Sequence, residues 1–276
     1  MIAIVVVCQA TATVAFQTAT NNRIITPSIM GFESLYVAIS TAAVYFLGAA
    51  GVVALQGTPP QFLLQIALMV FFSLMLYGWL LSGKYGNLQV MLLVGIILGG
   101  GGLGSVSVFM QRLLTPPSEF DVLTARLFGS VSNADAAYLP IAIPLCVAAA
   151  VALWWRARRL NLVALGRDVT TNLGLDHRRE IMIVLFLVSV LMAVSTALIG
   201  PMTFLASSSP HWRTSSRTPT TTGTCSPVAV LTGFVVLTGA YFVLKNLFYA
   251  EGAVSIIIEA VGGSVFLYVI LRKGRL

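Results

Sequence analysis

Charged residues are scarce in this sequence: Asp, Glu, Lys and Arg make up only 9% of its 276 residues, whereas a soluble domain carries about 25%. Hydrophobic residues make up 58%, and the mean hydropathy is +0.93. This composition excludes an ordinary soluble domain and predicts an integral membrane protein. The formal net charge of +7 does not indicate nucleic-acid binding, because the basic residues lie in short loops between apolar runs. The same charge favours contact with anionic lipid head groups.

Cysteine and histidine are also scarce, with three and two residues respectively. Cys8 and Cys146 lie in apolar runs, and the sequence has no CxxC motif or Cys/His pairing, so we predict neither a disulfide framework nor a metal site. No GxxxxGKS/T loop is present, and the GGGGLG run at residues 99–104 does not follow a strand. The sequence also lacks a nucleophile–base–acid set. These absences argue against an ATPase or another enzyme, and we expect no cofactor.

Apolar runs that are long enough, or nearly long enough, to cross a bilayer recur along the whole chain. A helical span needs about 20 residues, and the runs cover residues 1–16, 35–55, 62–81, 88–110, 139–153, 181–199, 228–244 and 253–271. They predict an all-α fold, a polytopic transmembrane helical bundle that forms a single domain over residues 1–276. The first run is short and lacks the basic start of a signal peptide, so we expect a span whose beginning is missing.

One stretch, residues 154–180, carries six of the sixteen Lys and Arg residues. A short basic loop between two spans is typical of the cytoplasmic side. Apolar residues recur in it at helical spacing, and Gly166 and Gly174 interrupt the run; these apolar residues are Leu160, Leu162, Val163, Leu165, Val169 and Leu173. We interpret the stretch as one or two short amphipathic helices that dock against a partner. The alternative is a solvated loop that only marks the cytoplasmic side.

The first polar interruption, residues 17–34, carries Arg23 and is therefore predicted to be cytoplasmic. Asn21, Asn22, Pro27 and Gly31 prevent a regular helix, which favours a bent segment buried among other helices. The sequence NNRIITPSIMGFESLY resembles the NPLA-P-LG signature of the iron-chelate and cobalamin permeases, the membrane subunits of ABC importers. It is most similar to the siderophore branch, and the resemblance extends over nearly the whole chain. It implies a permease fold of the type II ABC importer kind.

The same resemblance assigns roles to two further segments. LNLVALGRDVTTNLGLDHRR is similar to the family's coupling segment, in which a short helix pair inserts into a groove on the ATPase. It implies that Leu165, Gly166, Thr171 and Gly174, within residues 156–180, face an ATPase subunit. On the outside, RLFGSVSNAD resembles a region near the surface that receives an extracytoplasmic binding protein in relatives. Arg112 and Arg126 are candidates for pairing with its carboxylates; the alternative is that they are solvated or snorkelling residues.

We place the bent segment at residues 21–31 near the cytoplasmic gate of the translocation pathway. The glycine run and Glu259 are two further candidates for this pathway. The run at residues 88–110 contains Gly95, Gly99–Gly102 and Gly104, and small residues four apart let helices approach closely. These glycines line the pathway at a dimer centre or serve ordinary packing. Glu259 is the single acid deep in a span, which makes it a functional candidate, although a packing glutamate is equally consistent.

Residues 206–226, ASSSPHWRTSSRTPTTTGTCS, interrupt the resemblance, because the family continues here with an apolar helix. Family-like sequence resumes at residue 227 without a length gap. Re-reading each codon one base earlier can give GFLVATLAYQLADTYDHRHLF, which resembles siderophore permeases, so we predict a frameshift. The alternative is a genuine polar loop. A real frameshift would damage the permease, since Arg213 and Arg217 would each cost about 2.5–3.5 kcal/mol at the centre of a span; a sequencing error would leave the native protein intact.

From the residues and the resemblance together, we expect the permease subunit of an ABC importer for iron–siderophore complexes in the bacterial cell membrane. It would work by alternating access with a separate ATPase, an extracytoplasmic siderophore-binding protein and a second permease chain. Relatives begin with a further span and a basic external loop before the position of Met1, so one expected docking site is missing. The alternatives are a nonfunctional remnant, an orphan scaffold, or a secondary transporter that uses Glu259 for ion coupling.

Overall fold

The computed structural model describes residues 1–22, 25–55, 57–82, 93–114, 124, 127, 135–202, 222–246, 260 and 264. Within these ranges the chain is helical and has no β-strand. The α-helices are α1 (Ile2–Ala19), α2 (Phe32–Leu55), α3 (Pro59–Ser82), α5 (Leu103–Phe109), α7 (Leu139–Trp155), α8 (Ala157–Val163), α9 (Arg167–Asn172), α10 (His177–Ile199) and α11 (Thr222–Asn246). Two 3-10 helices, η1 (Ser28–Met30) and η5 (Ala136–Tyr138), and two π-helices, η2 (Ile96–Gly102) and η3 (Met110–Leu114), complete the described elements.

Six of the described helical segments are long and apolar enough to cross a membrane, which confirms the predicted polytopic helical bundle. They are Ile2–Ala19, Pro59–Trp79, Leu93–Arg112, Ala136–Trp155, His177–Ile199 and Pro227–Asn246. A helix suits a span because it pairs the backbone polar groups that lipid cannot satisfy.

Several boundaries differ from the predicted ones, because polar residues join the ends of helices. α1 continues through Gln17 to Ala19, and the hydroxyl of Thr18 donates to the carbonyl of Val14 at 2.8 Å. α10 begins at His177, before the apolar run, because the Asp176 carboxylate accepts hydrogen bonds from the backbone N–H groups of Arg178 and Arg179 at 3.1 and 3.2 Å.

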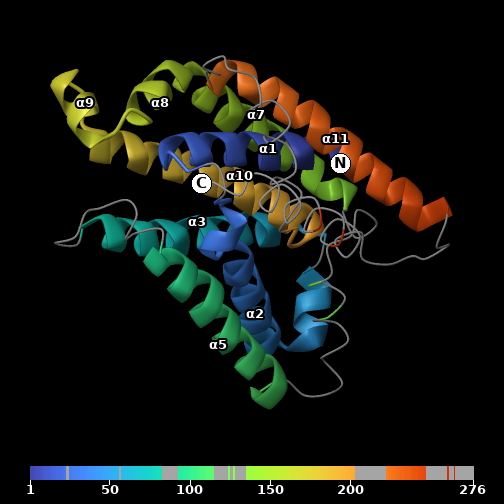
Figure 1. The fold of residues 1–276 in the computed structure, drawn as a ribbon. Coiled ribbons are helices and arrows are strands. Elements are labelled where there is room, and N and C mark those ends of the chain that lie inside the picture. The colour runs from blue at the N-terminus through green and yellow to red at the C-terminus, as the bar shows by residue number, and fades with distance from the viewer. Residues whose placement is uncertain are drawn as a thin grey trace.

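The run at residues 35–55, predicted to be about long enough to cross the bilayer, does not form one continuous spanning helix. α2 breaks at Gly48, whose φ of 70° and ψ of 163° are not helical, and the apolar helix that remains is Phe32–Gly48. Glycine reaches positive φ without the steric penalty that a Cβ would bring. Figure 1 shows the lighter blue turns after the break running in a different direction from the first part of α2.

α1 and α10 form the centre of the fold. In both spans 72% of the apolar window is buried, against 17–28% for the other four. α10 packs against α1, α3 and α7, and α1 also packs against α11; Figure 1 shows this layer with α2 and α5 extending away from it. Phe16, Leu185 and Met192 are fully buried in the shared core. A displacement of α10 therefore acts on most of the bundle.

Packing also brings together two thiols that are far apart in the sequence. Cys8 of α1 and Cys146 of α7 are buried free cysteines whose sulfur atoms lie 3.0 Å apart. Sequence spacing gave no sign of this contact, because it depends on how two apolar helices pack.

Candidate coupling surface and helix crossing

The coupling segment, residues 156–180, folds as the predicted pair of short helices, α8 and α9. Gly166 lies between them with φ 98°, and Gly174 follows α9 with φ 80°. An added Cβ at either glycine would meet no heavy atom of the described residues within 4 Å. Backbone conformation rather than crowding therefore favours glycine at both bends.

The inner face of this helix pair is anchored to the bundle. Ala157, Leu160 and Val163 of α8 are buried, and α8 contacts α1, α7, α10 and α11. α9 is fastened to α8 through Thr170, a fully buried residue whose hydroxyl lies 2.6 Å from the carbonyl oxygen of Gly166 and 3.1 Å from that of Leu162. The pair therefore forms one attached element rather than a solvated loop.

The outer side of the pair exposes three apolar side chains, Leu165, Val169 and Leu173, among polar ones, and we call these three the apolar face. Leu165, Val169 and Leu173, spaced four residues apart, are 60%, 43% and 56% exposed. Thr171 is also exposed, but its hydroxyl donates to the carbonyl of Arg167 within its own helix at 2.8 Å. Of the four residues predicted to face an ATPase, Leu165 lies on this apolar face, and Gly166 and Gly174 form the bends beside it. Val169 and Leu173, whose periodicity the sequence shows, complete the face.

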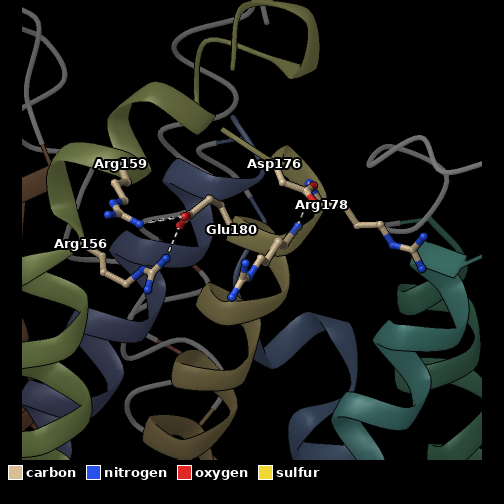
Figure 2. A network of polar contacts seen from close by, with 6 residues as sticks. Arg156, Arg159, Asp176, Arg178 and Glu180 are labelled. Carbon is tan, nitrogen blue, oxygen red and sulfur yellow. Dashed lines mark hydrogen bonds and ion pairs between the residues drawn. The ribbon is translucent and has the colours of Figure 1, made fainter. Parts of the chain in front are cut away.

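A network of charges ties the coupling segment to α10. Arg156 caps the junction of α7 and α8, and its guanidinium donates to the Glu180 carboxylate at 2.6 Å. Arg159 of α8 reaches the other carboxylate oxygen at 3.3 Å. Figure 2 shows both arginines reaching Glu180, which stands in the first turn of α10. A negative charge is favourable at this end of a helix. Sequence reasoning missed Glu180; an acid at the start of a span, beside a basic loop, was the available signal.

The segment at residues 21–31 is bent and partly buried, as predicted. Asn21 has φ 47°, Pro27 starts η1, and Gly31 ends it with φ 99°. Asn21 is exposed, whereas Thr26 and Met30 are fully buried. The bend lets the chain leave α1 and enter α2 in a new direction.

This bend meets the glycine run, which the sequence gave as a separate feature. Gly31 lies so close to Gly99 that a Cβ on either residue would overlap the backbone of the opposite segment. A Cβ at Gly95 would lie 2.7 Å from the terminal methyl of Met30, and the Tyr77 hydroxyl donates to the Met30 carbonyl at 3.3 Å. We call the contact of Met30 and Gly31 with Gly95 and Gly99 the glycine crossing. It confirms the close approach that small residues were expected to allow.

Of the predicted site residues Arg23, Arg112, Arg126 and Glu259, the structure describes only Arg112. Arg112 is exposed in η3, at the end of the span that contains the glycine run. Arg23, Arg126 and Glu259 lie outside the described residues, as does the 206–226 stretch apart from its last five residues, which begin α11. Among the described residues, no group of three or more His, Cys, Asp or Glu side chains is placed to hold a metal ion.

Comparison with known proteins gives consistent results. Residues 1–272 match the FecCD transport family. The chain is 50% identical to the petrobactin import system permease protein FatC of Bacillus anthracis, over 99% of this chain and 76% of the relative. It is 33% identical to the petrobactin import system permease protein YclO of Bacillus subtilis, over 96% and 83%. A metal-chelate type ABC transporter solved in an inward-facing conformation has the same fold, with a TM-score of 0.82 at 19% identity over 98% of this chain and 83% of that one. The chain is therefore a multi-pass cell-membrane protein that belongs to the FecCD transport family.

Proposed function

We propose that this chain is the permease subunit of an ABC importer that carries a ferric siderophore of the petrobactin kind into the cell. The observation that carries the proposal is the 50% identity to FatC over 99% of the chain. YclO, a second relative named for petrobactin import, supports it.

The apolar outer face of the coupling segment is the proposed site for an ATPase subunit. Leu165, Val169 and Leu173 expose apolar surface on the side of the membrane that the basic loop identifies as cytoplasmic. Apolar side chains exposed among polar ones, outside the apolar spans, are typical of a protein interface. Because the sequence has no phosphate-binding loop, the ATPase would be a separate chain.

The pathway would be completed by a second permease chain. FatC and FatD of Bacillus anthracis are both named as petrobactin import system permease proteins, and this chain is 50% identical to the first and 26% to the second. We therefore favour a FatD-type partner and a heterodimer. The bent segment at residues 21–31 and Glu259 are the proposed pathway residues, and Arg112 and Arg126 the proposed contacts of the extracytoplasmic binding protein.

An uptake experiment tests this function. The chain would be produced with the ATPase, binding protein and second permease of its own locus, in a bacterium whose own siderophore permeases are deleted. Uptake of radiolabelled iron would be measured with ferric petrobactin, ferric enterobactin and a ferric hydroxamate. We expect uptake of ferric petrobactin alone; equal uptake of ferric enterobactin would overturn the substrate assignment.

The alternative, a damaged permease, follows from residues 206–226 and is tested in the same cells. An immunoblot of the membrane fraction shows whether the chain is inserted. Inserted protein without uptake would favour the remnant. Resequencing of the region decides its origin, because an unambiguous read with no compensating insertion and deletion relative to close relatives would remove the frameshift hypothesis.

A further inference from the structure

The coupling segment is joined to the rest of the fold in two steps. α9 carries Val169 of the exposed apolar face and is fastened to α8 through the buried hydroxyl of Thr170. α8 is in turn fastened to α10 by the two arginines that bind Glu180. A displacement of the apolar face is therefore transmitted to the spanning helices through these contacts and through the buried residues of α8.

The ion pairs of Glu180 with Arg156 and Arg159 join α8 to α10. The Glu180 side chain is only 9% exposed, and each of its carboxylate oxygens accepts from a different arginine. Hydrogen bonds between charged groups are shorter and stronger than neutral ones. A single carboxylate therefore fixes the α7–α8 junction, through Arg156, and α8 itself, through Arg159, to the first turn of α10.

Resting on the proposed function, we propose that Glu180 is a positioning residue of the importer. It holds α8 on α10 so that a displacement of the coupling segment moves α10 with it. α10 packs against α1, α3 and α7, so its movement shifts most of the bundle. In this role Glu180 acts by keeping two helices in one moving body.

Other contacts also hold these two helices in the fold. α10 is capped by Asp176 and packs against α1, α3 and α7, and α8 is held by the buried residues Ala157, Leu160 and Val163. The Arg159 side chain is 57% exposed, so its ion pair contributes little to stability, whereas the Arg156 side chain is 27% exposed and its pair with Glu180 contributes more. Loss of the carboxylate therefore loosens the link between α8 and α10 without unfolding either helix.

The test uses the complete importer in proteoliposomes, with its ATPase, second permease and binding protein. ATP hydrolysis and uptake of ferric petrobactin are measured in the same vesicles, which gives the number of ATP molecules used per iron. We expect Glu180→Gln to raise this number roughly tenfold, within the usual range of coupling between sites, while hydrolysis itself persists. Glu180→Asp should restore part of the coupling. Lys245→Gln, which removes an exposed charge in the last turn of α11, outside the coupling segment, should behave as wild type.

A double variant shows whether Glu180 acts through its ion pair with Arg156. If the pair with Arg156 carries the effect, Arg156→Gln combined with Glu180→Gln should couple no worse than Glu180→Gln alone. An unchanged ATP-to-iron ratio in Glu180→Gln would overturn the proposal, and so would a proportional loss of uptake, hydrolysis and membrane-inserted protein, which indicates a structural role. If the wild-type importer carries a different ferric siderophore, the ratio is measured with that one, and only the substrate assignment fails. A wild type that imports no ferric siderophore overturns the proposed function and with it the role of Glu180.

Discussion

The coupling segment and the glycine crossing, both at bends between helices, are built in opposite ways. At the crossing, two backbones meet directly, so that neither Gly31 nor Gly99 has room for a Cβ. In the coupling segment, Gly166 and Gly174 have open space around them, and the attachment is made by side chains. Substitution at the crossing should therefore damage the fold, whereas substitution in the coupling segment should leave the fold intact and alter what it does.

The largest effect is expected at the crossing. Gly99→Val should destabilise the protein by about 3 kcal/mol, the upper end of overpacking costs, because the new side chain overlaps the backbone at Met30. Gly101→Val is the matched control in the same run, since a Cβ there meets no described heavy atom within 4 Å; its cost should be about 0.5 kcal/mol or less. Thermal unfolding in detergent measures both, and equal losses would contradict the backbone contact.

Gly166→Leu should come next and affect coupling rather than folding. A side chain at φ 98° strains the bend between α8 and α9 and adds bulk beside the apolar face. We expect uptake to fall roughly tenfold, a typical coupling effect, with normal amounts of protein in the membrane. Gly239→Leu in α11, where a Cβ also meets no described atom within 4 Å, is the control. Unchanged ferric siderophore uptake in Gly166→Leu would exclude the bend from coupling.

A smaller effect is expected from the apolar face itself. Leu173→Ser removes one half-exposed apolar side chain, and the loss of about 1 kcal/mol of burial should weaken ATPase binding roughly fivefold. Asn172→Ser, a polar exposed neighbour, should bind normally. The amount of ATPase that copurifies at limiting concentrations measures the difference, and equal recovery would show that the ATPase contacts another surface.

The smallest effect on the protein is expected from single cysteine substitutions, which test on which side of the membrane the bent segment lies. Asn22→Cys, in a chain whose native cysteines are replaced by alanine, should react with a membrane-impermeant thiol reagent from the cytoplasmic side only. Asp135→Cys, which lies at the opposite end of the Ala136–Trp155 span from the basic loop, should react only from outside. Labelling of Asn22→Cys in intact resting cells would place the bent segment on the wrong side.

The bundle and the coupling helices could be predicted, because both depend on residue type along the chain. Long apolar runs need no partner to be recognised as spans, and the periodicity around Gly166 describes an amphipathic helix pair by itself. The pairing of Gly31 with Gly99, the contact of Cys8 with Cys146 and the ion pairs of Glu180 could not be predicted in this way. Each joins residues from different helices, and their proximity is set by packing rather than by spacing in the sequence.

The break in α2 shows a further limit of reading composition alone. Gly48 lies in a continuous apolar run, where a glycine within a helix is common in membrane proteins, so nothing in the run marked a positive φ. The sequence also directed attention to Thr171, whereas the buried neighbour Thr170 fastens α9 to α8. Hydroxyl groups one residue apart on a helix point in different directions, and only the packed structure shows which one faces inward.

The glycine crossing also limits how this protein can change over evolutionary time. Two side chains in contact can exchange size, so that a larger residue on one helix is tolerated after a smaller one appears on the other. Neither Gly31 nor Gly99 can be replaced by a smaller residue, and each faces the backbone of the other segment. No second substitution can make room for the first. In descendants that keep this fold, the two positions should stay fixed together and show no compensating pairs.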